Sequence, residues 1–323
     1  MSSDRPKRIL LVRLGGIGDV VCTLPALEAI RAGFPDAFIG FAVEERAYDI
    51  LNRHPALDVV HRFPRRQVMS DLKKFHWRTA FAEIGSYKRS LHAQHYDLAL
   101  DFQRPLKGAI HTMMGGARRK VGFTAPTAQE FNHWFYREHI DPSPAKHWAD
   151  KFLAMASAIG GIPEAARYRL PDAPESRERV QQFLAANELD RFIAIHPGTS
   201  GFDLARRWEP KRFGELARKL NTERGIRTVV TWGPGEKELA EHVVQSSGDH
   251  AMLSFESHSL LDLAELYRRA RIYIGCDTGP MHIATAVGLP SVVLFGSGNP
   301  AAYGPRSPGS RIIAHYTNGQ LRP

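Results

Sequence analysis

Short apolar runs alternate with longer amphipathic stretches along this chain, and this alternation constrains the fold more than any other feature. Such alternation is typical of parallel sheets covered by helices on both faces. Helical spacing of apolar residues fills the gaps between most of the runs. The runs predict buried strands at Arg8–Leu14, Phe38–Val43, Val59–Phe63, Tyr96–Phe102, Lys120–Phe123, Phe192–His196, Thr228–Trp232, Ile272–Cys276 and Ser291–Phe295.

The alternation is interrupted once, by a stretch from Gly160 to Ser176 that is rich in Gly and Pro and is typical of a linker. A chain of 323 residues is long enough for two domains. We therefore expect an α/β fold of two doubly wound domains, over residues 1–165 and 166–323. Ligands of such sheets bind outside the carboxyl ends of the strands, so we expect a site in a cleft between the domains.

Positive charge is concentrated between Arg62 and Lys120, where thirteen Lys and Arg face four acids; this matches the whole chain's net charge of +9. Such a surface attracts an anionic membrane, a phosphorylated glycolipid or nucleic acid, unless it is only a solvated face. No zinc-finger spacing or RNP-type aromatic motif is present, which disfavours nucleic acid. Phe75, Trp77 and Phe81 lie among the cations, but they could equally form the buried face of a helix from Asp71 to Leu91.

Several classes of protein are disfavoured by what the sequence lacks. Two cysteines cannot make a disulfide framework and favour a reduced, cytosolic setting. No segment is typical of a signal peptide or a membrane span, since the uncharged residues 278–305 are rich in Gly and Pro. The P-loop, HExxH and GxSxG motifs are absent, and so is the D-x-D pair that binds a metal and a diphosphate. We expect phosphates to be neutralised by cations and helix ends, with no metal and no cofactor.

Glycines follow the first strand as Gly15-Gly16-Ile17-Gly18, and Asp19 comes at the start of the next helix. Glycines let the backbone turn tightly and approach a ligand. Their spacing differs from the dinucleotide fingerprint GxGxxG. Asp19 has two interpretations: an acid that complements the helix dipole, or a general base for a hydroxyl.

Three further loops in the second half carry polar residues directly after predicted strands. His196 to Thr199 precedes Arg206, a combination suited to phosphate oxygens or to a plain surface loop. Trp232 could pack against a nucleobase or belong to the core. Glu236 could bind ribose hydroxyls or be an acid at the start of a helix. The segment from Asp277 to His282 opens a helix that Asp277 and Thr278 can cap, and such a helix end suits a diphosphate.

These four loops, in this order, resemble the lipopolysaccharide heptosyltransferases of glycosyltransferase family nine. The segments GGIGDVVCTLPAL and CDTGPMHIATAVGLPSVVLFG carry most of the resemblance, which runs from about Ile9 to Pro305. It implies a GT-B fold of two Rossmann-like domains. It also implies metal-independent, inverting transfer of heptose from ADP-heptose to an anionic Kdo–lipid A acceptor of the lipopolysaccharide inner core. We expect the protein to be cytoplasmic and peripherally associated with the inner membrane.

The resemblance also implies roles for individual residues. Asp19 would be the general base of the transfer. The donor would contact Thr199, Arg206, Trp232, Gly233, Glu236, Asp277, Thr278, Gly279 and His282. The acceptor would contact Gly15, Gly16, Arg65, Arg66, Gln103 and Lys107.

Two departures from the family pattern stand out. Arg206 occupies a position where a lysine is common, and the residues after Pro305 show little helical pattern, although the family tends to end in a crossing helix. Three other functions stay open: a family member with a different heptose acceptor, a nicotinamide-dependent dehydrogenase, and a glycan- or nucleotide-binding module without transfer activity. The dehydrogenase requires an acid after the second strand, where Glu44 and Glu45 lie.

Overall fold

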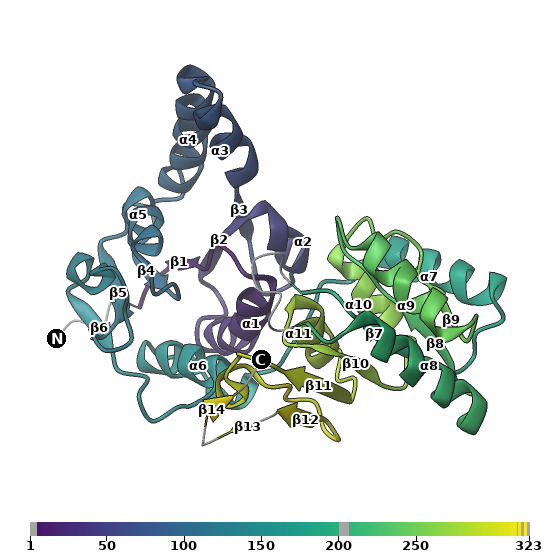
Figure 1. Ribbon diagram of the computed structural model, residues 1–323. Helices are drawn as coiled ribbons and strands as arrows, with labels where there is room; N and C mark the ends of the chain where they lie inside the picture. The colour runs from purple at the N-terminus through teal and green to yellow at the C-terminus, as the bar shows by residue number, and fades with distance from the viewer. Residues whose placement is uncertain (1–4, 200–206, 315, 318–319, 322–323) are drawn as a thin grey trace. The chain divides into compact units, whose positions relative to one another are not determined.

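The computed structural model describes residues 5–199, 207–314, 316–317 and 320–321. The chain divides into two compact units, Met1–Pro171 and Asp172–Pro323 (Figure 1). Each unit is built on a six-stranded sheet whose strands pair in parallel and are joined by helices. The expected α/β class, with two doubly wound sheets, is therefore confirmed.

The first unit orders its strands β3-β2-β1-β4-β5-β6. Leu11 at the centre of β1 lies opposite Phe41 on one side and Leu100 on the other. The strands are β1 Arg8–Val12, β2 Phe38–Glu44, β3 Val59–Phe63, β4 Leu98–Asp101, β5 Arg119–Phe123 and β6 Glu138–Ile140. The helices are α1 Ile17–Gly33, η1 Glu45–Ala47, α2 Tyr48–Leu51, α3 Arg65–Lys73, α4 Trp77–His92, α5 Leu106–Met114, η2 Asn132–Phe135, α6 Trp148–Ala158 and η3 Pro163–Ala165.

The second unit orders its strands β12-β11-β10-β7-β8-β9, which is the same path as in the first unit when counted from β7. The strands are β7 Phe192–His196, β8 Arg227–Val230, β9 Ala251–Leu253, β10 Tyr273–Cys276, β11 Ser291–Phe295 and β12 Arg311–Ala314. The helices are α7 Pro174–Ala186, α8 Pro210–Arg224, α9 Lys237–Ser247, α10 Leu260–Arg269, α11 Gly279–Ala286 and α12 Pro300–Tyr303. A short antiparallel pair, β13 Tyr316–Thr317 and β14 Gln320–Leu321, follows.

The central strands form because their side chains are apolar on both faces. Ile9, Leu10 and Leu11 of β1 are fully buried, as are Ala194 and Ile195 of β7. A parallel sheet covered by helices on both sides requires such strands. Both sheets reverse their strand order beside the first strand, at β1/β4 and at β7/β10. Loops at such a reversal line the ligand crevice of doubly wound sheets, and most of the candidate residues lie on them.

One of the two interpretations of the segment with Phe75, Trp77 and Phe81, a single helix from Asp71 to Leu91, is wrong. The chain forms two helices there, α3 and α4, and breaks at Phe75, whose backbone is left-handed with φ +61°. The amides of Phe75 and His76 bond back to the carbonyls of Leu72 and Asp71, which ends α3. The predicted buried face is also wrong, since 75% of Phe75, 49% of Trp77 and 63% of Phe81 are exposed.

Short edge strands were also missed by the sequence pattern. These are β6 and β9, and also β12, which pairs with β11 and so brings part of the chain after Pro305 into the second sheet. Among the helices of the described residues, none is both long and apolar enough to cross a bilayer.

Candidate active site

Asp19 lies in the first turn of α1, where an acid complements the helix dipole. Its Oδ2 forms an ion pair of 2.5 Å with Nη2 of Arg13, the residue that follows β1. Arg13 is buried and its Nη1 donates to the carbonyl of Phe102 at 2.8 Å. A quarter of the Asp19 side chain remains exposed. The carboxylate is therefore held in one orientation by a buried guanidinium while it stays open to a ligand.

Gly15 and Gly16 make room for two carboxylates. A Cβ on Gly16 would stand 2.4 Å from Oδ2 of Asp19, and one on Gly15 would stand 2.8 Å from Oε2 of Glu44. Gly16 also has φ +79°, a conformation that residues with a Cβ rarely adopt. The two glycines thus place Asp19 and Glu44 on either side of one loop.

Glu44, at the end of β2, is a buried carboxylate that gathers two of the predicted acceptor residues. Its Oε1 lies 3.6 Å from Nε of Arg65 and 3.5 Å from Nζ of Lys107. These cations come from α3 and α5, which are about forty residues apart in the sequence. Sequence reasoning considered Glu44 only as a ribose ligand of a dehydrogenase. The signal for this role was available, because Glu44 is an acid at the carboxyl end of an apolar strand.

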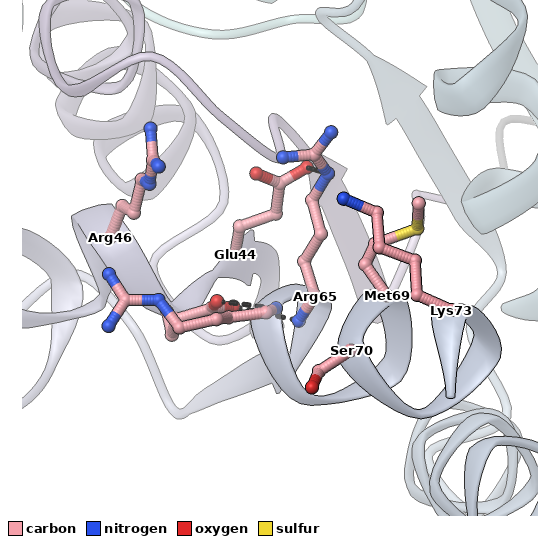
Figure 2. Close-up of a pocket in the computed structure, with 8 residues that line it drawn as sticks. Glu44, Arg46, Arg65, Met69, Ser70 and Lys73 are labelled. Atoms are coloured by element: carbon pink, nitrogen blue, oxygen red, sulfur yellow. Dashed lines mark hydrogen bonds and ion pairs between the residues drawn. The ribbon is translucent and has the colours of Figure 1, made fainter. Parts of the chain in front are cut away.

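A hollow of about 340 Å³ lies against Glu44 (Figure 2). Glu45 helps to shape it, because its two carboxylate oxygens accept hydrogen bonds from the backbone amides of Arg65 and Arg66, at 2.8 and 2.7 Å. Those amides belong to the first turn of α3, where an anion stabilises the helix. The hollow is lined by Glu44, Glu45, Arg46, Arg65, Arg66, Met69, Ser70 and Lys73. Four cations thus face two acids, and sequence reasoning had named only Arg65 and Arg66.

Gln103 is buried, and it follows the buried Asp101 at the end of β4. Oδ1 of Asp101 accepts a hydrogen bond from the Gln103 amide at 2.7 Å, and Oδ2 accepts others from Asn132 and Tyr136 at 3.0 and 2.5 Å. Burial raises the pKa of Asp101 to about 6, although these hydrogen bonds favour its charged form. Asp101 therefore fixes the loop that carries Gln103 and leads into α5 with Lys107.

In the second unit, Glu236 connects two of the predicted donor loops. Its Oε2 accepts a hydrogen bond from the amide of Gly233 at 3.0 Å and lies 3.4 Å from Nε2 of His196. A Cβ on Gly198 would stand 2.3 Å from the same carboxylate. Burial alone would raise the pKa of Glu236, but His196, the Gly233 amide and Arg207 together lower it below its ordinary value. The carboxylate is therefore ionised and placed between the ends of β7 and β8.

Two more predicted donor residues lie on these loops. Thr199 is buried, three residues after the end of β7. Trp232 is partly buried against the core of the second unit, and its Nε1 donates to the carbonyl of Ser254 at 3.4 Å. Its core contact matches the structural interpretation of this tryptophan, while its remaining exposure leaves one part of the ring open. Arg206 lies outside the residues that the structure describes.

The last predicted donor segment opens helix α11 directly after β10. Asp277 and His282 are buried, and a Cβ on Gly298 would stand 2.4 Å from Oδ2 of Asp277. Thr278 occupies the N-cap position and Gly279 the first turn. The predicted capping by Thr278 is wrong, because its hydroxyl donates to the carbonyl of Cys276 instead, at 3.4 Å. The N-terminal amides of α11 therefore lack a bond from this side chain.

Among the described residues of unit 1, Arg13 pairs with Asp19, and Glu44 pairs with Arg65 and Lys107. The loop of Gly15 and Gly16 lies against both carboxylates. Those of unit 2 bring Gly233 to Glu236 and His196. Within the described ranges, no three His, Cys, Asp or Glu side chains are grouped so as to hold a metal ion.

Known proteins resemble this chain over most of its length. Lipopolysaccharide heptosyltransferase 1 of Pseudomonas aeruginosa is 29% identical over an alignment of 307 positions that covers 92% of this chain and 81% of that protein. The protein of the same name from Escherichia coli K12 is 26% identical over an alignment of 325 positions that covers 97% of this chain and 92% of that protein.

Solved structures show the same fold. A family 9 glycosyltransferase from Veillonella parvula superposes with a TM-score of 0.78 at 22% identity, over 95% of this chain and 85% of that chain. The E. coli heptosyltransferase WaaC with ADP superposes with a TM-score of 0.77 at 23% identity, over 94% and 92%. These likenesses confirm the GT-B type of fold. The model of the family described as glycosyltransferase family 9 (heptosyltransferase) matches residues 84–321. This chain is therefore a glycosyltransferase and belongs to glycosyltransferase family 9.

Proposed function

We propose that this protein transfers a heptose from ADP-heptose to a hydroxyl of an anionic lipopolysaccharide inner-core precursor of the Kdo–lipid A type. The observation that carries the proposal is the arrangement in the first unit. There, the Arg13-bound carboxylate of Asp19 shares a glycine loop with Glu44, which gathers Arg65 and Lys107 beside a cationic hollow. A base and an anion-binding surface are what such an acceptor requires.

The acceptor side is supported by charge. The hollow offers two arginines on α3, Arg65 and Arg66, whose guanidinium groups suit phosphate and carboxylate oxygens. Arg46 and Lys73 add to the same field. Of the four acids between Arg62 and Lys120, Asp71 and Asp101 are buried and neutralise little of the surface. Relatives of this chain are named as lipopolysaccharide heptosyltransferases.

The donor side is supported by the loops after β7, β8 and β10. The ionised Glu236 suits the ribose hydroxyls, and the partly exposed Trp232 suits the nucleobase. The first turn of α11, with Thr278 and Gly279, offers backbone amides and the positive end of the helix dipole to a diphosphate. One of the solved structures with the same fold contains ADP. In this proposal residues 1–165 bind the acceptor and residues 166–323 bind the nucleotide sugar.

The reaction follows from these roles. The acceptor hydroxyl attacks the anomeric carbon of the heptose, and its proton passes to the carboxylate of Asp19. The bond from that carbon to the phosphate oxygen breaks from the opposite face, so that the configuration inverts and ADP leaves with the bonding electrons. A positioned base contributes about 10²–10⁴-fold to such a step. Amides at the α11 terminus stabilise the negative charge that grows on ADP, so that the step needs no metal.

Replacing Asp19 tests the proposal. Asp19→Ala should abolish heptose transfer while calorimetry still measures ADP binding, because the donor loops belong to the other unit. Asp36→Ala is the matched control, since Asp36 is an exposed acid of the same unit, and it should transfer at the wild-type rate. Transfer by Asp19→Ala at the wild-type rate would show that the base is wrongly assigned. Unchanged turnover in EDTA would support metal independence.

A different heptose acceptor, a dehydrogenase and a binding module without turnover are the alternatives. The dehydrogenase loses support, because Glu44 is paired with two cations and Glu45 with the amides of α3, so neither carboxylate is arranged for a ribose. Titration with NADH against ADP separates these two enzymes. Turnover of ADP-heptose separates an enzyme from a binding module, and a panel of truncated acceptors identifies the hydroxyl that receives the sugar.

A further inference from the structure

Three aromatic side chains, Phe75, Trp77 and Phe81, are exposed where α3 meets α4, and we call them the aromatic tip. Helices α3 and α4 pack against each other and project together from the sheet of the first unit (Figure 1). The ring of Trp77 lies between the other two, with centroids 6.1 Å from Phe75 and 6.5 Å from Phe81. The exposed fractions of 75%, 49% and 63% leave these rings as one apolar patch facing solvent.

The backbone at the tip gives no structural reason for an aromatic residue. Phe75 follows the C-cap of α3 with φ +61°, a position and conformation at which glycine is strongly preferred. A bulky residue is disfavoured in this conformation. Phe75 also gains little from burial, since three quarters of it is exposed. A strained and exposed aromatic residue points to a function outside the fold.

Cations surround the tip. Lys73, Lys74 and Arg78 are exposed beside it, and Lys88 and Arg89 are exposed further along α4. Over residues 65–92, seven Lys and Arg face two acids, and one of these acids, Asp71, is buried beside Gln67. Apolar aromatic rings within a group of cations are typical of surfaces that bind the interface of anionic membranes.

We propose that the aromatic tip inserts into the interfacial region of an anionic lipid bilayer, with the surrounding cations on the headgroups. This inference rests on the proposed function and locates its membrane contact. The hollow beside Glu44 extends along helix α3 from Arg65 to Lys73, over about 13 Å, and the tip follows directly after its end. A lipid-linked acceptor whose sugars reach the hollow would thus keep its acyl chains in the bilayer that the tip contacts.

Sedimentation with vesicles of phosphatidylethanolamine and phosphatidylglycerol tests the inference with the full chain. Trp77→Ala should weaken binding at least about tenfold, because a tryptophan ring contributes a large apolar area at an interface. Wild-type binding should fall in high salt and on phosphatidylcholine vesicles. Trp134→Ala is the matched control, since Trp134 is 72% exposed in the same unit but lies on η2; it should bind as the wild type does.

Several results would overturn the inference: no sedimentation of the wild type with anionic vesicles, an equal loss in both variants, or no loss in Trp77→Ala. If concentrated wild-type chain dimerises in the ultracentrifuge and Trp77→Ala does not, the tip binds a second copy instead. The rate of transfer to a water-soluble, deacylated acceptor distinguishes the membrane inference from the proposed function, because this reaction needs no membrane. Trp77→Ala should retain that transfer, whereas failure of the wild type to carry it out would count against the proposed function alone.

Discussion

Replacing Gly16 by alanine should lower the rate of transfer about 10²-fold in addition to destabilising the fold. Gly16 has φ +79° and ψ 104°, so a Cβ there introduces strain of about 1–3 kcal/mol. The Cβ would also stand 2.4 Å from Oδ2 of Asp19, whereas ordinary contact begins at 3.4 Å, so that the carboxylate must move by about 1 Å. A misplacement of about 1 Å in a catalytic group lowers the rate by about 10²-fold. The movement also strains the 2.5 Å pair with Arg13.

The assay combines kcat for heptose transfer with urea unfolding of the same protein. Gly225→Ala is the matched control, because Gly225 has φ +63° at the end of α8 and a Cβ there would meet nothing within 4 Å. It should lose about 1–2 kcal/mol of unfolding free energy and keep the wild-type kcat. A wild-type kcat for Gly16→Ala would refute the reasoning that this loop positions Asp19, and so would an equal loss of kcat in both variants.

Two other predictions concern one buried and one partly buried carboxylate. Because the pKa of Asp101 rises from 3.8 to about 6 on folding, the folded chain holds a proton that the unfolded chain releases. The protonated form therefore stabilises the fold below pH 3.8, and up to about 3 kcal/mol of unfolding free energy is lost as the pH rises through about 6. Urea unfolding of the wild type should show this fall in unfolding free energy with pH, and Asp101→Asn should not. Parallel curves of unfolding free energy against pH for the two proteins would contradict the prediction. Glu236→Gln should weaken ADP binding about tenfold in calorimetry, because the charged bonds to Gly233 and His196 are weakened. Glu238→Gln, exposed on the same helix, should bind as the wild type does, and equal affinities of the two variants would disprove this role of Glu236.

The two sheets were predictable because parallel strands that are buried on both faces consist of continuous runs of apolar residues. Phe192–His196 and Ser291–Phe295 were placed to the residue. The edge strand β3 was also placed to the residue, but the short edge strands β6, β9 and β12 lack this signal. Glu138–Ile140 has three residues and Arg311–Ala314 is mostly exposed, so neither differs from a loop in composition.

The break between α3 and α4 was not predictable for a different reason. A left-handed residue that ends a helix is usually glycine or asparagine, and here it is Phe75. With its aromatic residues among cations, the segment from Asp71 to Leu91 therefore indicated one amphipathic helix. Tyr87 and Leu91 of this segment do pack in the core, but the aromatic residues near the break, Phe75, Trp77 and Phe81, are exposed, so the pattern indicated burial correctly for only part of the segment.

In the candidate site, motifs located the loops but not the pairing within them. Asp19 and Arg65 were named from sequence because they match a resemblance. Arg13 was given no role, and Glu44 was considered only as the acid of a dehydrogenase, although they hold those two residues in place. The position of Glu44 after an apolar strand marked it as a site residue, but its partners Arg65 and Lys107 come from helices far away in the sequence, and no local pattern encodes that pairing.

The repeated strand order of the two units has a consequence for how this enzyme can change. Each unit is one continuous half of the chain with its own sheet, and each carries its polar loops at the place where its strand order reverses. Substitutions in the loops that follow β1, β2 and β4 leave the packing of the second sheet, which contains β7, β8 and β10, intact. Under the proposed division of roles, selection can therefore modify acceptor binding and donor binding as separate traits, each supported by a scaffold that the other does not share.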